Sequence, residues 1–243
     1  KPVLRRYTNV KGNISPRINY YEEIEYTSAE ISSDSGLDVS AYIKPSGTGT
    51  YYFSRAKSAA VYRSLTTAVP LHKSAPGIIQ VVMRNDDTYT GYLEELFRTP
   101  FIWTPKMIKT MYQCDERVGS DCISFVIYGR RRMGHDVRYC PLDKVKRYLN
   151  QVSPDSICLS RINGKEVYTI DGVPVKLEKY SIKKGTLLHF EHHAAIFCED
   201  RGLPGILDRE DLALQSIGVT PGITPLSSTD YTLHPLGIYE WKE

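Results

Sequence analysis

The sequence predicts a mainly β protein of the α+β class: a single antiparallel β-sandwich-like domain with one or a few helices and an N-terminal arm. Two observations carry this prediction. Short runs of alternating or β-branched apolar residues recur along the chain, separated by turn residues, and one amphipathic stretch has the length of a helix. The 243 residues are enough to bury a substantial core without disulfide or metal.

The first half of the chain is expected to alternate strands with one helix. Residues 37–43 and 50–53 flank a turn at 45–49 and predict a hairpin. Residues 54–68 predict an amphipathic helix that Ser54 caps and Pro70 ends. Further strands are expected at 78–83, 88–97, 101–103 and 122–128, with 136–140 as the return of the last one.

The second half contains the strongest turn signal. Asp171-Gly172 separates apolar runs at 167–170 and 173–177, and this dipeptide favours a two-residue hairpin turn. Residues 187–197 fit a strand or a helix, and beyond residue 202 the chain is expected to form an extended, loop-rich wrap. We divide the chain into an irregular assembly arm, residues 1–35, and a core, residues 36–243.

Composition excludes several classes of protein. The net charge of +3, from 31 basic and 28 acidic residues, is too small for bulk attraction to nucleic acid or to an anionic membrane. No apolar run approaches the roughly 18 residues of a transmembrane helix. The five cysteines show no C-x-x-C pair and are expected to be free thiols in a reducing cytoplasm.

The densest ionisable cluster is His189-Phe190-Glu191-His192-His193. On a strand, His189, Glu191 and His193 share one face and form a ligand set of two histidines and a carboxylate. The spacing matches neither H-E-x-x-H nor a zinc finger, so paired residues on a half-buried element are favoured over a metal site. Cys198 with one of these histidines has the parts of a nucleophile and its base, although a buried structural cysteine is favoured there. We therefore predict no metal and no catalytic residue.

Arg130, Arg131 and Arg132 are expected at a hairpin tip. Guanidinium groups fork around phosphate oxygens, which makes a bound nucleotide an open possibility, although no cofactor is required. The alternative is a solvated turn, or a subunit contact with acidic residues such as Glu22, Glu23 and Glu25.

Tyrosine is unusually frequent, with 18 tyrosines against 6 phenylalanines. A core built only for burial has no need of so many hydroxyl groups, so many phenols are expected at packed interfaces. Because phenols titrate near pH 10, an assembly that uses them is expected to dissolve in alkali. The tyrosines of this expected alkaline-sensing interface are Tyr20, Tyr21, Tyr26, Tyr51 and Tyr52.

The order of several segments resembles a known family. The tyrosine-rich segment 37–53, the stretch 54–68, Ile78-Ile79-Gln80-Val81-Val82, Trp103-Thr104-Pro105, Tyr139-Cys140-Pro141-Leu142 and Ala194-Ala195-Ile196-Phe197-Cys198 resemble the polyhedrins of cypoviruses, over about residues 36–243. The resemblance implies a β-sandwich with a helical N-terminal arm. It also implies homotrimers packed in a crystal lattice around virus particles, as occlusion bodies in the host cell cytoplasm. Gly12 and Pro16 depart from it because they do not favour a long helix in the arm.

The sequence thus predicts a non-enzymatic structural protein that assembles into viral occlusion bodies, stable at neutral pH and dissolved by alkali, without a membrane partner. A viral matrix or capsid protein is the first alternative. A metal-dependent hydrolase that uses His189, Glu191 and His193 is the second.

Overall fold

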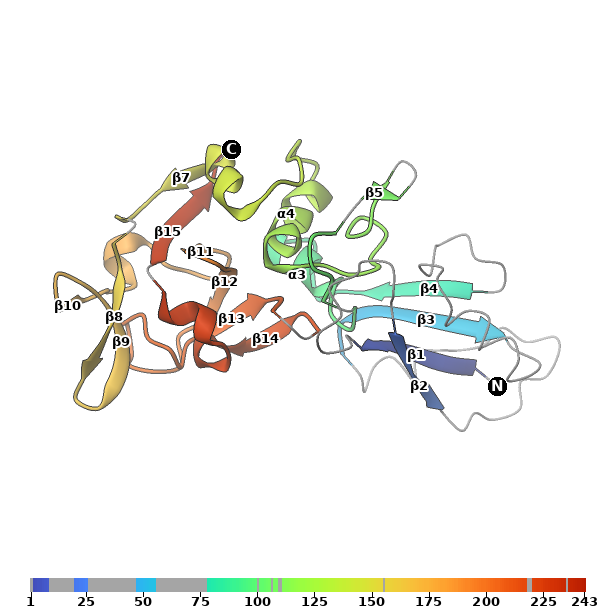
Figure 1. Ribbon diagram of the computed structural model, residues 1–243, viewed down its shortest axis with the longest axis horizontal. Helices are drawn as coiled ribbons and strands as arrows, with labels where there is room; N and C mark the ends of the chain where they lie inside the picture. The colour runs from blue at the N-terminus through green and yellow to red at the C-terminus, as the bar shows by residue number, and fades with distance from the viewer. Residues whose placement is uncertain are drawn as a thin grey trace. The chain divides into compact units, whose positions relative to one another are not determined.

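The structure is a computed structural model, and it describes residues 2–8, 20–25, 47–55, 78–99, 101–105, 107–108, 111–154, 156–217, 220–234 and 236–243. These residues form antiparallel sheets with short helices between them (Figure 1), which confirms the predicted mainly β, α+β fold class. The chain divides into two compact units. The first contains residues 1–121 and 218–221, and the second contains residues 122–217 and 222–243. The sequence did not indicate a boundary near residue 121.

The first unit contains a four-stranded antiparallel sheet in the order β2-β1-β3-β4. Its strands are β1 (Pro2–Thr8), β2 (Tyr20–Glu25), β3 (Gly49–Arg55) and β4 (Ile78–Met83). The expectation of an irregular arm is therefore wrong for β1 and β2. Their register sets Arg5 opposite Glu23 and Arg6 opposite Glu22, and cross-strand positions of opposite charge favour such pairing. The predicted boundary between residues 35 and 36 lies outside the described residues.

Two predictions for the first half also fall largely outside the described residues, namely the strand at 37–43 and most of the helix at 54–68. Ser54, the expected N-cap, belongs to β3, whose two neighbours in the sheet are β1 and β4.

The segment 88–97 is a helix rather than a strand. α3 (Tyr89–Glu94) begins after Thr88, whose hydroxyl oxygen accepts a hydrogen bond from the Gly91 amide at 3.3 Å. This N-cap satisfies an amide of the first turn that would otherwise lack a partner, and it decides the conformation of a segment rich in aromatic and β-branched residues. Of the strand expected at 101–103, only a bridge from Phe101 to Ser120 is present. A small hairpin pairs β5 (Met107–Ile108) with β6 (Met111–Tyr112).

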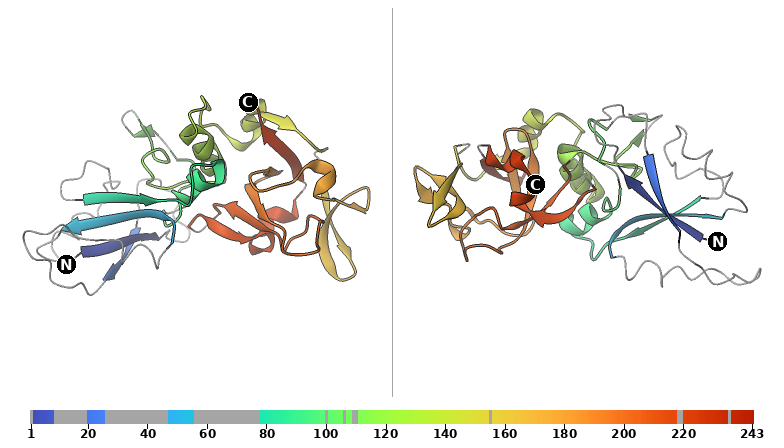
Figure 2. Two further views of the ribbon diagram at one scale, coloured as in Figure 1. Left: turned by 180° about the vertical axis from the view of Figure 1, so that it is seen from behind. Right: turned by 60° about the horizontal axis from the view of Figure 1, so that its bottom comes forward.

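The second unit is built on a six-stranded antiparallel sheet in the order β14-β13-β12-β11-β15-β7. Its strands are β7 (Leu149–Gln151), β11 (Leu187–Phe190), β12 (Ala194–Glu199), β13 (Leu212–Gln215), β14 (Gly222–Pro225) and β15 (Leu236–Trp241). The ambiguous segment 187–197 is therefore two strands that reverse direction at residues 191–193. The tail is not a loop-rich wrap, because β15 lies inside the sheet between β11 and β7 (Figure 2).

A second, three-stranded sheet contains β8 (Cys158–Ile162), β9 (Lys165–Ile170) and β10 (Val173–Pro174). The predicted turn at Asp171-Gly172 is confirmed, with φ of +50° and +77° at its two residues. The remaining short helices are η2 (Leu142–Tyr148), η3 (Glu178–Tyr180), η4 (Leu226–Ser228) and η5 (Asp230–Leu233). A buried apolar cluster that includes Tyr168, Leu188, Phe190, Phe197 and Ile238 holds this unit together.

The segment 122–132 forms the longest described helix, α4 (Cys122–Arg132), and not the predicted strand with a return at 136–140. Residues from Ile123 to Gly129 are buried on every side of the helix. A helix buried all round shows no alternation of apolar and polar residues, so its apolar run has the appearance of a core strand.

Candidate active site

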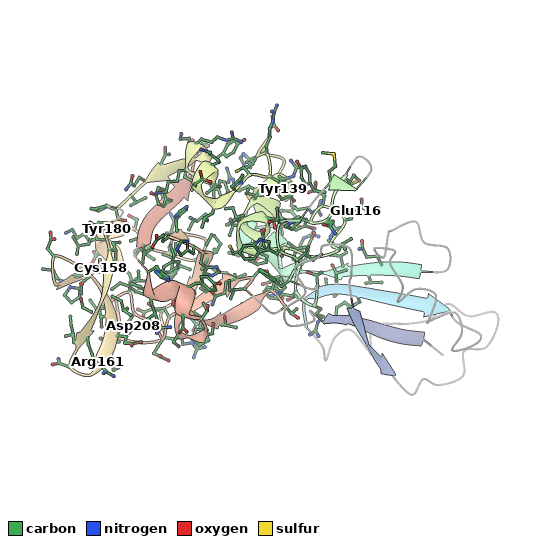
Figure 3. All side chains as sticks on the ribbon, in the orientation of Figure 1. Glu116, Tyr139, Cys158, Arg161, Tyr180 and Asp208 are labelled. Carbon is green, nitrogen blue, oxygen red and sulfur yellow. The ribbon has the colours of Figure 1, made fainter. Side chains whose placement is uncertain are left out.

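The three arginines lie in the last turn of α4, not at a hairpin tip. Arg130 donates to the Lys242 carbonyl at 3.0 Å, and Arg131 donates to the Val137 carbonyl at 2.9 Å. The Arg131 guanidinium also lies 4.9 Å from the centre of the Tyr139 ring, which is labelled in Figure 3. Cations near a helix C-terminus stabilise the helix, so Arg130 and Arg131 have a structural role here. Arg132 is exposed.

Of the five tyrosines predicted to sense alkali, the structure describes the side chain of Tyr51. It is 1% exposed, donates its hydroxyl to the Gly47 carbonyl at 2.6 Å and lies beneath the Arg98 guanidinium. Tyr51 is therefore buried within the first unit. Tyr20, Tyr21 and Tyr52 lie on β2 and β3, and Tyr26 lies outside the described residues.

The predicted ligand set does not converge. His189 lies on β11 and its Nε2 donates to the Leu142 carbonyl at 3.1 Å. Glu191 lies in the exposed turn, between the side chains of His192 and His234. His193 is buried, because the chain has already reversed before it. Among the described residues, no three His, Cys, Asp or Glu side chains form a group that could hold a metal ion.

None of the five cysteines, all of which lie in the described residues, forms a disulfide. Cys198 is nevertheless a poor partner for His193. It lies five residues farther along the same extended segment, which is roughly 17 Å at a rise of about 3.4 Å per residue.

His193 has the most unusual environment of the cluster. It is fully buried, and its Nε2 lies 2.8 Å from Oε1 of Gln215 on the neighbouring strand β13. Within the described part of the chain, its other ring nitrogen, Nδ1, is buried and has no hydrogen-bond partner. Burial lowers the pKa of His193 to about 4, so the imidazole is neutral at pH 7.

The orientation of the Gln215 amide determines which nitrogen of His193 carries the proton. The Gln215 Nε2 group lies 3.2 Å from the Pro225 carbonyl, which is only an acceptor, so the amide NH₂ must face that carbonyl. Oε1 therefore faces His193. A carbonyl oxygen accepts a hydrogen bond, so His193 Nε2 carries the proton and the buried Nδ1 has a lone pair. His193 is arranged as a base with Nδ1 as the basic atom.

α4 is a second element that contacts the strand directly after His193. The helix packs against β12, and its C-terminal turn lies at the end of β15, where the Arg130 guanidinium is 5.6 Å from the Trp241 ring. β12 and β15 run parallel to each other, since both pair antiparallel with β11. α4 begins with Cys122, a half-buried residue.

The position of Cys122 suits a reactive thiol. The N-terminus of a helix is the positive end of its dipole, and a thiolate is stabilised there. Cys122, His193 and Gln215 together have the parts of a nucleophile, a base and a residue that orients the base. In papain-like proteases a cysteine, a histidine and an asparagine have these three roles.

Sequence reasoning missed Cys122 and Gln215, although one signal for the first was available. The basic residues Arg130, Arg131 and Arg132 at one end of the run 122–132 are typical of the last turn of a helix. They would have placed Cys122 at its N-terminus. Gln215 had no comparable signal, because only the pairing of β12 with β13 brings it to His193.

Comparison with known proteins finds no match to a protein family, to a curated protein sequence or to a solved structure. None of the helices in the described residues is long and apolar enough to span a membrane.

Proposed function

We propose that the second unit is a cysteine hydrolase that cleaves an amide or ester, with Cys122 as nucleophile, His193 as general base and acid, and Gln215 as the residue that orients His193. The observation that carries this proposal is the buried His193. Its Nε2 is held by Gln215, its buried Nδ1 has no hydrogen-bond partner among the described residues, and α4 packs against β12, the strand that follows it.

The reaction follows from the protonation states at this site. His193 Nδ1 takes the proton of the Cys122 thiol, and the thiolate sulfur attacks the carbonyl carbon of the substrate. The imidazolium then gives this proton to the leaving amine or alcohol as the C–N or C–O bond breaks, which leaves a thioester on Cys122. A water molecule, activated in turn by His193, attacks the thioester, releases the acid and restores the thiol.

The hydrogen bonding of the site bears on two of these steps. His193 is neutral at pH 7 because burial lowers its pKa, which leaves Nδ1 with a lone pair but also makes it a weaker base than an exposed imidazole. The proton on Nε2 gives Gln215 Oε1 a donor whether His193 is neutral or charged, so the ring keeps its orientation when Nδ1 becomes protonated. The first-turn amides of a helix lack partners within the helix and are suitable donors for a developing oxyanion.

The proposal replaces the hypothesis of a metal-dependent hydrolase. The ligands of that hypothesis, His189, Glu191 and His193, do not form a group that could hold a metal ion. It also differs from the prediction of a non-enzymatic protein. Assembly into occlusion bodies stays a prediction that rests on the resemblance to cypovirus polyhedrins.

Selective alkylation tests the proposal without a known substrate. Wild-type protein is treated with iodoacetamide at pH 6 to 7, and the modification rate of each cysteine is followed by peptide mass spectrometry. We expect Cys122 to react at least about tenfold faster than the exposed Cys158, since a base-assisted thiol is more nucleophilic at this pH than an ordinary one. His193→Gln should remove this advantage and leave the rate of Cys158 unchanged.

A result in which Cys122 reacts no faster than Cys158, and in which His193→Gln changes neither rate, contradicts the proposal. A panel of amide and ester substrates extends the test. Any hydrolysis by the wild-type protein should be abolished in Cys122→Ala and retained in Cys158→Ala.

A further inference from the structure

We propose that the second unit binds single-stranded nucleic acid on a surface formed by residues 130–148 and 239–243, which we call the basic surface. The proposal does not depend on the hydrolase function, because it uses neither Cys122 nor His193. It rests on three properties of these two segments: they contact each other, they concentrate positive charge, and their basic side chains alternate with aromatic rings.

Hydrogen bonds join the two segments of the basic surface. Arg130, at the end of α4, donates to the Lys242 carbonyl at 3.0 Å, and the Lys242 amide donates to the Tyr148 carbonyl at 3.0 Å. The Lys242 ammonium group donates to the Arg147 carbonyl at 2.8 Å, and the Arg138 amide donates to the Tyr148 hydroxyl at 3.3 Å. Figure 1 shows the chain between α4 and β7 beside the C-terminus. The end of α4, η2 and the end of β15 therefore form one continuous part of the second unit.

Positive charge is concentrated in these segments. They contain eight basic and four acidic side chains, a net charge of +4, whereas the whole chain carries +3, so the rest of the chain is slightly negative. A small overall charge excludes bulk attraction to nucleic acid but not a local contact. Lys144 is paired with Asp143 at 3.2 Å. The exposed cations that we assign to phosphate contacts are Arg132, Arg138, Arg147 and Lys242.

Aromatic rings alternate with these cations. Bases that are not paired in a duplex stack on aromatic rings and on guanidinium planes, so this alternation favours a single strand over a duplex. The rings of Tyr139, Tyr148 and Trp241 are half-buried and keep part of their surface accessible. The four pairs of cation and ring are Arg131 with Tyr139 at 4.9 Å, Arg147 with Tyr148 at 4.7 Å, Lys146 with Tyr239 at 5.3 Å and Arg130 with Trp241 at 5.6 Å.

An anionic membrane is the other partner with matching charge, and the apolar side chains argue against it. Within these two fully described segments, Met133 is the one large apolar side chain that is exposed. Attachment to a membrane surface depends on the apolar area that enters the lipid, and a single methionine supplies little.

The test measures binding of the full chain to a fluorescent oligouridylate of about 20 nucleotides by anisotropy, at salt concentrations from 50 to 200 mM. Each phosphate contact to a single strand contributes about −0.7 to the slope of log K against log salt. With three or four contacts we expect a slope of about −2 to −3, so affinity should fall about fifteenfold or more over this range.

A triple variant and a charge-matched control locate the binding surface. Arg132→Gln/Arg138→Gln/Arg147→Gln should weaken binding at 50 mM salt about tenfold or more and reduce the slope by about 2. The control, Arg161→Gln/Lys165→Gln/Lys184→Gln, removes the same charge from exposed positions elsewhere in the unit and should keep most of the affinity. Circular dichroism checks that both are folded. If the triple variant does not fold, Arg138→Gln/Arg147→Gln leaves α4 unchanged and should reduce the slope by about 1.4.

A second pair of variants tests stacking. Tyr139→Leu removes a ring of the basic surface and should weaken binding to the single strand at least about fivefold, whereas Tyr139→Phe keeps the ring and should bind nearly as wild type does. An RNA duplex of the same length should bind more weakly than the single strand, because its bases are already stacked.

The inference is overturned if the wild-type protein does not bind the oligonucleotide at 50 mM salt, or if the triple variant and the control bind equally well. Binding to vesicles that contain phosphatidylserine, lost in the triple variant and without any binding to the oligonucleotide, would assign the basic surface to a membrane instead. A duplex that binds as tightly as the single strand, with no effect of Tyr139→Leu, would also overturn the proposal of a single-stranded partner.

Discussion

The environment of His193 links the candidate site to acid stability. Its ordinary pKa of about 6.5 applies in the unfolded chain, and burial lowers it to about 4 in the folded protein. Between these values the unfolded state binds more protons, so stability falls as the pH falls. The stability that the neutral, buried His193 contributes is fully present above pH 6.5 and is lost by about pH 4.

We therefore expect the free energy of unfolding to decrease by up to about 3 kcal/mol between pH 7 and pH 4 because of His193 alone. His193→Gln should make the denaturant midpoint less sensitive to pH in this range. His192→Gln is the matched control, since His192 is exposed in the adjacent position of the same turn. An equal pH dependence in both variants contradicts the assignment.

The burial of Tyr168 determines how the stability of the folded protein is expected to change in alkali. Its hydroxyl donates to the Thr232 carbonyl at 3.0 Å inside the second unit, and burial raises the pKa of the phenol. The stability that the neutral Tyr168 phenol contributes is therefore fully present below the ordinary phenol pKa of about 10. It is lost as the pH rises above that value. We expect the protein to unfold above roughly pH 10, and Tyr168→Phe to make this loss less steep. Tyr180→Phe, at a partly buried position of the same unit, should leave the slope unchanged. The slope is measured by circular dichroism between pH 8 and pH 12.

At the scale of elements, the loop between β12 and β13 is held by one carboxylate. Asp211 accepts the backbone amides of Arg201, Gly202 and Asp208, the last of which is labelled in Figure 3. This loop joins the strand that follows His193 to the strand that ends with Gln215. Its geometry therefore affects whether the two side chains meet.

Asp211→Ala leaves buried amides without an acceptor, and we expect it to lower the free energy of unfolding by about 2–4 kcal/mol. Glu210→Ala, at the exposed neighbouring position, should change it by less than about 0.5 kcal/mol. Chemical denaturation measures both values. Equal effects in the two variants would show that the Asp211 carboxylate does not hold the loop.

The same elements show what local sequence can predict. The Asp171-Gly172 turn and β4 were predicted correctly, because a turn type and a short β-branched run depend on neighbouring residues. α4 was assigned incorrectly, because complete burial removes the periodicity that distinguishes a helix. The contact between His193 and Gln215 depends on the pairing of β12 with β13, which no local pattern records.

At the scale of the whole molecule, the predicted assembly arm contains strands that pair within the first sheet. β1 lies between β2 and β3, so residues 1–35 include two of the four strands of the first sheet. Deletion of this segment exposes one edge of β3, and exposed edges favour aggregation.

We expect the chain without residues 1–35 to show a lower unfolding temperature and a greater tendency to aggregate, measured by calorimetry and light scattering. Replacing Lys1 by Gln in the full chain is a suitable control, because it leaves the paired residues of β1 in place. A truncated protein that stays monomeric and keeps the unfolding temperature of the full chain would support the original prediction of an assembly arm outside the core fold.

The position of β15 has a consequence for the order of folding. β7 and β15 are about 85 residues apart in sequence but adjacent in the sheet, whereas β11, β12, β13 and β14 pair with their neighbours along the chain. Local hairpins form quickly and distant strands pair late, so the meander from β11 to β14 can form before β15 joins the sheet. The contacts of Arg130 with Trp241 and Lys242 at the end of α4 form only after β15 is in place. A folding chain would therefore hold its histidine and glutamine in register before the C-terminal turn of α4 reaches its final contacts.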